Sequence, residues 1–171
     1  MTPTGRPLGT TDPSSLSLLD GTGAHVGGDP PTKERALHLA VYDARPSAAA
    51  VVHLHSTYAV AVSCLAELDP NEPLVPRTPY HVVRAYPAGV VPYARPGSEE
   101  LAAAVRASAR AFRVLLLANH GPVLAAPSLE EAVYAAEELE EACRLHLILY
   151  GHRTHALGRS EIADIRHHIR R

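Results

Sequence analysis

The chain has 171 residues, of which 46% are hydrophobic and 20% are charged, and its formal net charge is -2. This length is typical of one domain, and the apolar content argues against a disordered chain. The charge gives no basic footprint for nucleic acid or an anionic membrane, and no apolar run reaches the roughly 20 residues that span a bilayer. Cys64 and Cys143 are far apart and indicate neither a disulfide framework nor a cysteine-based zinc site. We therefore expect a cytoplasmic protein without nucleic-acid or membrane partners.

The first half of the chain alternates short apolar segments with turns and helical patterns. Thr32 is the expected N-cap of the first helix, and Pro46 ends it, because the residue before a proline avoids the helical region. In chain order we expect strands at residues 16–19 and 24–26, a helix at 31–44, a strand at 48–55 and a short helix at 57–68. The alternation in the last segment would also suit a strand.

The second half of the chain contains the longest helical pattern. Ser128 and Glu131 form a capping box at its start, and Glu140 and Arg144 are spaced for an i,i+4 ion pair on its surface. Ser160 is the expected cap of a basic terminal helix. We expect strands at 80–83, 89–92, 114–118 and 123–125, and helices at 98–111, 128–150 and from 160 onward.

Helices and short strands are interleaved, and no repeat of 20–50 residues is visible. Because each sheet face must be covered by another layer, this order predicts an α/β sandwich with a mixed sheet and helices on its faces. No linker divides the chain, so we expect residues 1–171 to form a single domain.

Three of the 11 histidines are placed for metal binding. His53 and His55 are two residues apart on a predicted strand, so both side chains leave the same face. His120 follows another core strand, in a turn before Gly121. Three histidines with an open fourth position are common in catalytic zinc sites, and imidazole suits divalent first-row metals generally.

Each of these patterns has a plainer explanation when taken alone. The His53 and His55 pair could be hydrogen-bonded histidines near a strand end, and the segment around His120 could be only a turn. Glu34 is predicted in the first turn of its helix, where the positive end of the dipole favours any carboxylate. It is the joint occurrence of the three histidines with Glu34 that favours a metal site.

Four segments of the chain form one pattern: Thr2-Pro3-Thr4-Gly5, Pro31-Thr32-Lys33-Glu34 with His38, His53-Leu54-His55-Ser56 and Asn119-His120-Gly121-Pro122. Together they resemble the signature blocks of the class II aldolase/adducin family. The match in order and spacing runs from Met1 to about Gly151, and segments around Tyr80, Tyr93 and Tyr134 resemble the branch that decarboxylates 3-oxo-tetronate 4-phosphates. The resemblance implies a three-layer α/β/α sandwich with a mixed, largely antiparallel central sheet.

The resemblance also implies roles for individual residues. Glu34 matches the family's catalytic glutamate, and Tyr80 falls near a tyrosine that reaches into a neighbouring subunit's site. The implied metal ligands are His53, His55 and His120, for Zn²⁺ or a similar ion such as Mn²⁺ or Co²⁺. The implied substrate-phosphate residues are Thr4, Gly5, Thr32 and Lys33. The family forms homotetramers with active sites between subunits, so the same is expected here.

The expected chemistry is the breaking of a carbon–carbon bond next to a carbonyl, for which a divalent ion acts as electron sink. Glu34 would move the proton, provided that burial raises its pKa. The expected substrate is a small phosphorylated sugar or sugar acid. Decarboxylation of a 3-oxo-tetronate 4-phosphate is the first expectation, and aldol cleavage of the fuculose-phosphate type is the next. A non-catalytic, adducin-like assembly module is the alternative from another class.

The front end departs from the family pattern. Family members carry an N-terminal helix and a first strand with a Ser-Gly-Asn block, and here Met1 directly precedes the Thr-Pro-Thr-Gly segment. The chain is therefore expected to lack that helix and strand. We expect the metal site to persist without them, and apolar surface to be exposed where they would lie.

Overall fold

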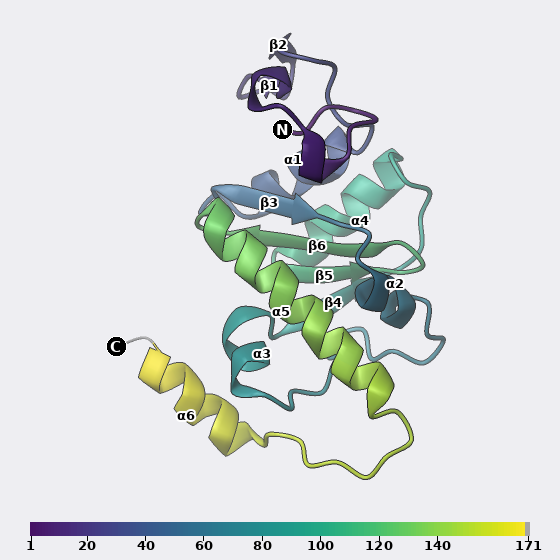
Figure 1. Ribbon diagram of the computed structural model, residues 1–171, viewed down its shortest axis with the longest axis vertical. Coiled ribbons are helices and arrows are strands. Elements are labelled where there is room, and N and C mark those ends of the chain that lie inside the picture. The colour runs from purple at the N-terminus through teal and green to yellow at the C-terminus, as the bar shows by residue number, and fades with distance from the viewer. Residues whose placement is uncertain (170–171) are drawn as a thin grey trace.

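The computed structural model describes residues 1–169, and a four-stranded sheet forms its centre (Figure 1). In spatial order the strands are β3 (Ala50–His53), β6 (Gly121–Ala126), β5 (Val114–Leu117) and β4 (Ala88–Val91). Strand β6 is antiparallel to β3 and β5, whereas β4 is parallel to β5. The expected mixed, largely antiparallel sheet is confirmed. A separate ribbon pairs β1 (Leu18–Leu19) with β2 (His25–Gly27).

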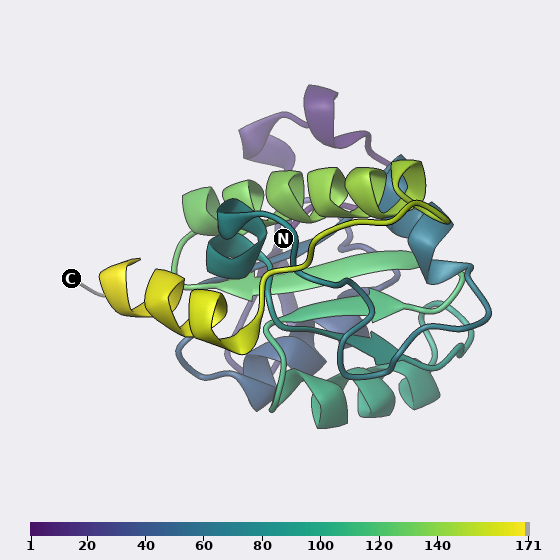
Figure 2. The same cartoon turned by 90° about the horizontal axis from the view of Figure 1, so that it is seen from below.

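Helices cover both faces of the sheet and complete the three layers seen in Figure 2. One face carries α1 (Arg35–Ala44) and α4 (Glu99–Ala109). The other carries α2 (Thr57–Ser63), α3 (Pro79–Arg84) and α5 (Leu129–Ile148), with α6 (Arg159–Ile169) against α3. Two 3-10 turns, Leu8–Thr10 and Pro13–Ser15, precede β1. Within residues 1–169, no helix is both long enough and apolar enough to cross a bilayer.

Strand β5 contributes to the cores on both sides of the sheet. Leu115 and Leu117 pack with α1 and α4, whereas Val114 and Leu116 pack with α2 and α5. Successive side chains of a strand point to opposite faces, so each face of this strand needs its own apolar residues. This explains why the segment is continuously apolar instead of alternating with polar residues.

The two long helices begin where their caps predict. The Ser98 hydroxyl accepts a hydrogen bond from the Leu101 amide at the start of α4, and the Ser128 hydroxyl accepts one from the Glu131 amide at the start of α5, each at 3.1 Å. These bonds satisfy amides that the first turn of a helix leaves without partners. Local capping chemistry therefore fixes both helix starts.

Helix α1 begins later than the sequence predicts. Residue Pro31 forms an isolated antiparallel bridge with Pro3, which keeps this part of the backbone extended. The Thr32 hydroxyl accepts a hydrogen bond from the Glu34 amide at 3.3 Å, and the helix proper starts at Arg35. Glu34 is consequently the N-cap residue, and its predicted place in the first helical turn is wrong.

Residues 80–83, predicted as a strand, belong to helix α3. Pro79 occupies the first turn, and the Thr78 hydroxyl accepts a hydrogen bond from the His81 amide at 3.2 Å. Proline at the start of a helix and a threonine cap are both strong helix-start signals, and here they outweigh the strand preference of Val82 and Val83. The helix buries His81 and Val82.

Two predicted side-chain interactions on the late helices are wrong. The Arg144 guanidinium donates to Glu141, at 2.6 Å and 2.8 Å, instead of pairing with Glu140. The Glu140 carboxylate turns toward α2. Ser160 is not an N-cap, because α6 begins at Arg159 and places Ser160 inside its first turn.

An apolar groove of about 840 Å³ lies between the edge strand β3 and α5. Val51, Val52 and Leu54 line it from the β3 side, and Leu129 and Val133 line it from α5. The two α5 side chains are exposed. Apolar side chains are thus accessible to solvent along this edge of the sheet.

The buried His81 predicts a specific acid sensitivity. Burial lowers the pKa of His81 from its ordinary value of 6.5 to about 4. Between these values the unfolded chain binds a proton that the folded chain does not, so the free energy of unfolding falls as the pH drops through this window. We predict that His81→Leu makes this fall shallower by up to about 1.4 kcal/mol per pH unit. Urea unfolding at pH values from 7 to 4 measures it, and a slope equal to the parent's would contradict the prediction.

Candidate metal centre

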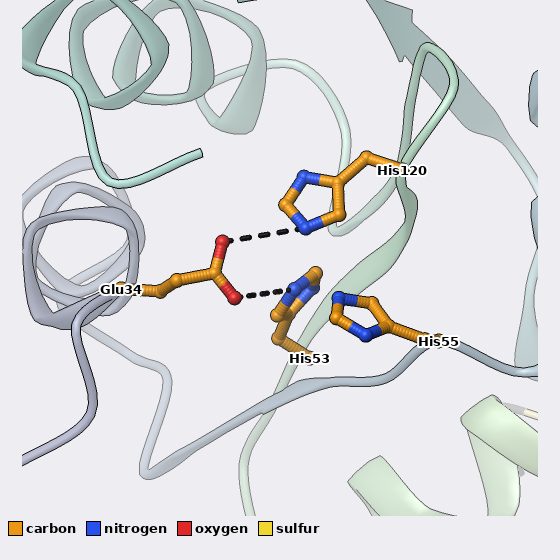
Figure 3. A group of neighbouring side chains, drawn as sticks. All are labelled: Glu34, His53, His55 and His120. Carbon is orange, nitrogen blue, oxygen red and sulfur yellow. Dashed lines mark ion pairs between the residues drawn. The ribbon is translucent and has the colours of Figure 1, made fainter. Parts of the chain in front are cut away.

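Three imidazoles and one carboxylate meet at the end of the sheet (Figure 3). His53 is the last residue of β3, His55 lies before α2, His120 lies between β5 and β6, and Glu34 directly precedes α1. The ring centroids of His53 and His55 are 5.1 Å apart, those of His53 and His120 are 4.8 Å apart, and those of His55 and His120 are 5.0 Å apart. The rings thus form a nearly equilateral triangle, with the Glu34 carboxylate facing it.

His55 reaches the cluster by a different route from the one predicted. Strand β3 ends at His53, so His55 does not share a strand face with it. The ladder with β6 stops here because its next partner is Pro122, which has no amide to donate, although its carbonyl still accepts from the Leu54 amide at 3.3 Å. The chain then turns before α2, and this turn brings the His55 ring back beside His53.

The turn that carries His120 packs directly against the turn that carries His55. Asn119 adopts a left-handed conformation with a φ of 56°, which asparagine tolerates better than most residues. Gly121 has a φ of 144°, and a Cβ built there would lie 2.5 Å from the Leu54 carbonyl oxygen. Only glycine allows this approach, so Gly121 sets the spacing between the two histidine turns.

The hydrogen bonding of His53 fixes its tautomer. Its Nδ1 lies 2.8 Å from the carbonyl oxygen of Pro122, which can only accept, so Nδ1 carries the proton. In the neutral ring the lone pair is then on Nε2, which lies 3.1 Å from Oε2 of the Glu34 carboxylate. A backbone carbonyl that orients an imidazole in this way is the usual partner of a metal-ligating histidine.

Buried polar atoms in the cluster lack hydrogen-bond partners among the described residues. They include Nε2 of His53 and Oε1 of Glu34, the latter 3.3 Å from Nε2 of His120. A lone pair directed at a carboxylate is unfavourable in a buried site unless a cation lies between them. The residues present therefore fit a bound cation better than a self-contained hydrogen-bond network.

The pKa shifts of Glu34 and His120 favour the forms of these two groups that bind metal ions. Contact with the His53 ring lowers the pKa of Glu34, because a proton on Nε2 of that ring is shared with the carboxylate, and burial opposes the shift. This corrects the expectation that burial raises the pKa of Glu34, and it leaves the carboxylate ionised at neutral pH. Burial, followed by the nearby His53, lowers the pKa of His120. Neutral imidazole and ionised carboxylate are the forms that bind metal ions.

The geometry suits a divalent ion. One donor atom from each of the four residues lies within 4.8 Å of the others. Ligands of a tetrahedral zinc ion at about 2.1 Å are about 3.4 Å from one another, so side-chain shifts of about 1 Å would close the shell. The group Glu34, His53, His55 and His120 can thus hold a divalent metal ion, and a set of three nitrogens and one oxygen does not by itself select one metal.

The four residues predicted for phosphate binding lie together beside Glu34. The Thr4 amide donates to the Pro30 carbonyl at 3.0 Å, and the Thr32 amide donates to the Thr2 carbonyl at 3.2 Å. These bonds flank the bridge that sets residues 2–5 against residues 30–33. Thr4 and Gly5 are therefore neighbours of Thr32 and the exposed Lys33, and their role with phosphate stays a prediction.

Tyr80 lies apart from the metal cluster within the chain. It projects from α3 with 70% of its surface exposed and lines a hollow of about 410 Å³ together with Arg84 and Tyr134. Figure 1 shows α3 beyond the β4 edge of the sheet and α1 beyond the β3 edge. The expected action of Tyr80 in a neighbouring subunit's site stays a prediction.

Two further groups lie beside the cluster, the Pro122 carbonyl and His38. The Pro122 carbonyl orients His53, and no residue pattern indicates a backbone contact of this kind. His38 lies one turn after Glu34, and its ring centroid is 6.5 Å from that of His53. Burial lowers the pKa of His38 to about 4, so this ring is uncharged at neutral pH where it lies beside the site.

The chain belongs to the class II aldolase/adducin family, because residues 1–147 match the model of the "Class II Aldolase and Adducin N-terminal domain". It is 44% identical over 165 residues to a 3-oxo-tetronate 4-phosphate decarboxylase from Haemophilus influenzae, a match that covers 96% of this chain and 79% of the relative. It is 35% identical to an L-fuculose phosphate aldolase from Escherichia coli, covering 86% of this chain and 66% of the aldolase.

A solved structure agrees with the sequence relatives. The crystal structure of YgbL from Klebsiella pneumoniae superposes with a TM-score of 0.92 at 43% identity, covering 96% of this chain and 79% of that one. The expected fold and family are thereby confirmed. At this level of identity to decarboxylases of the family, the chain is an enzyme of the class II aldolase type.

The contact at Gly121 gives a testable prediction. Gly121→Ala places a methyl group against the Leu54 carbonyl in a backbone conformation that alanine disfavours. We predict a loss of about 1–3 kcal/mol in the free energy of unfolding, measured by urea titration. Gly21→Ala is the matched control, because nothing lies within 4 Å of a Cβ at Gly21. Equal stabilities of the two variants would show that the turns do not need glycine at position 121.

Proposed function

We propose that this protein is a metal-dependent lyase that removes CO2 from a 3-oxo-tetronate 4-phosphate, with Zn²⁺ as the resident ion. The observation that carries the proposal is the convergence of three imidazoles and one ionised carboxylate from four separate segments. Identities of 40–46% to decarboxylases of that name support the choice of substrate. His53, His55 and His120 would hold the ion, and Glu34 would complete the shell until the substrate takes its place.

The reaction needs an electron sink and a proton. The bond between the carboxylate carbon and its neighbour breaks, CO2 leaves, and the electron pair passes toward the adjacent ketone oxygen. A divalent ion at this centre would supply the positive charge that stabilises this oxygen as it becomes negative. The carbon that lost CO2 then takes up a proton, which gives dihydroxyacetone phosphate.

Glu34 is the residue that we assign to this proton transfer. Its carboxylate is the acidic group of the cluster, and it lies opposite the three imidazoles (Figure 3). Because Glu34 is ionised, it can accept a proton from water or from the substrate and deliver it to carbon. This assignment places the base within reach of any substrate bound between Glu34 and the three rings.

The substrate phosphate is assigned to the segments beside Glu34. Thr4 and Gly5 lie against residues 30–33, and the exposed Lys33 adds a positive charge. Backbone amides, a hydroxyl group and a lysine are the groups that commonly bind a phosphate dianion. A phosphate held there would leave the oxo-acid end of the substrate directed toward the histidines.

The proposal predicts distinct effects on turnover and on metal content. Glu34→Gln keeps the shape of the side chain but cannot relay a proton, so CO2 release from a 3-oxo-tetronate 4-phosphate should fall at least about 100-fold. The three imidazoles remain, so zinc should still bind, as measured by metal analysis after zinc exposure and desalting. An unchanged rate would refute the role of Glu34.

The aldolase relatives define the second candidate substrate. Incubating the parent protein with L-fuculose 1-phosphate tests aldol cleavage through the release of an aldehyde. If the protein released an aldehyde from L-fuculose 1-phosphate but no CO2 from the oxo acid, aldol cleavage would replace decarboxylation as the proposed activity. Activity on neither substrate, in protein that holds zinc, would count against both.

We further propose a homotetramer in which Tyr80 acts in a neighbouring subunit's site. Tyr80 is exposed, and the hollow that it lines contains no residue of the metal cluster, which supports this arrangement. Tyr80→Phe and Glu34→Gln should each be nearly inactive alone, and co-expression of the two variants should restore activity. A mixed assembly contains sites that combine an intact Tyr80 with an intact Glu34 from different chains. Mixed tetramers without recovered activity would place both residues in the same chain's site.

A further inference from the structure

Helix α2 connects the two turns that carry His55 and His120. The helix begins at Thr57, two residues after His55. At its other end, the Ser63 carbonyl accepts a hydrogen bond from the Asn119 amide at 3.0 Å, one residue before His120. A displacement of α2 would therefore move both histidine turns, whereas His53 is held by the sheet.

The start of α2 is capped from a distant part of the chain. The Glu140 carboxylate on α5 accepts hydrogen bonds from the Tyr58 amide at 2.8 Å and from the Ala59 amide at 2.9 Å, one with each oxygen. The local N-cap residue, Ser56, makes no side-chain cap. Glu140 thus supplies the capping that the first turn of a helix requires, and its negative charge suits the positive end of the helix.

We propose that Glu140 is a positioning residue for the metal centre, which it serves by capping α2 and so holding the turns of His55 and His120 in register. This inference rests on the proposed metal-dependent function. A helix of seven residues is too short to be stable alone, so its placement depends on contacts such as this one. Two charge-assisted bonds to one carboxylate fix both its position and its direction.

The close packing of the turns transmits this placement to the ligands. The Leu54 carbonyl, just before His55, lies against Gly121, just after His120. Val60 on α2 lies against the same glycine. Loss of the Glu140 cap would allow the start of α2 to move away, and the His55 ring would follow because only Ser56 separates it from the helix.

The test compares Glu140→Gln with the matched control Glu137→Gln. Both changes remove one negative charge from the same helix, and Glu137 is an exposed residue one turn earlier. Zinc affinity is measured by competition with a chromogenic chelator. We expect about tenfold weaker zinc binding in Glu140→Gln, the size typical of lost outer-shell support, and parent-like binding in Glu137→Gln. Glu140→Asp, which retains the charge but is one methylene shorter, should also bind zinc more weakly than the parent.

A second readout uses the metal-free protein, so that it does not depend on zinc. Glu140→Gln should shift the imidazole NMR signals of His55 and His120 and speed amide exchange at Tyr58 and Ala59, with little change at His53. Glu137→Gln should leave all of these signals unchanged. If Glu140→Gln does not fold, Glu140→Asp provides the same comparison.

The outcomes separate this inference from the proposed function. A parent protein that binds no zinc would overturn the proposed function, and the imidazole signals would still decide the role of Glu140. Parent-like zinc affinity and parent-like ring signals in Glu140→Gln would overturn the positioning role. Equal losses in Glu137→Gln and Glu140→Gln would attribute the effect to charge alone and would also overturn it.

Discussion

The register between β3 and β6 is the constraint on which the site depends. His53 is paired with Val123, and the β5–β6 turn that carries His120 begins just before that position. A shift of one residue would turn the His53 side chain to the opposite face of the sheet, because successive side chains alternate. The buried apolar residues of β6 and the partly buried valines of β3 pack into cores on both faces, so the packing that stabilises the fold also selects this register.

The parts of the fold that were predictable depend on local chemistry. The serine caps at Ser98 and Ser128, together with the apolar run of β5, place their elements correctly because each signal lies within a few residues of its effect. The strand expected at 80–83 was wrong because the capping of α3 by Thr78 outweighs the preference of two valines. The first helix was predicted too early because the bridge from Pro3 to Pro31 links distant segments.

The candidate site shows the same division between local and distant information. The identities of Glu34, His53, His55 and His120 could be predicted from motif and resemblance, and the structure brings these four together. The route by which His55 arrives could not be predicted, since it depends on where the ladder with β6 ends. The partner of Glu140 could not be predicted either, because its contact spans more than 80 residues and the nearby Arg144 offers a plausible local alternative.

Two different parts of the fold hold the two sides of the metal centre. The three imidazoles stand on the sheet and on the turns packed at its end, whereas Glu34 and the candidate phosphate residues stand where the first residues of the chain are bridged to the segment before α1. The β3–β6 ladder holds the histidine side, and the bridge between Pro3 and Pro31 holds the side of Glu34. The bridged segment around Glu34 can therefore vary while the histidines and Glu34 itself stay unchanged, which allows new substrates to evolve on one ion-binding scaffold.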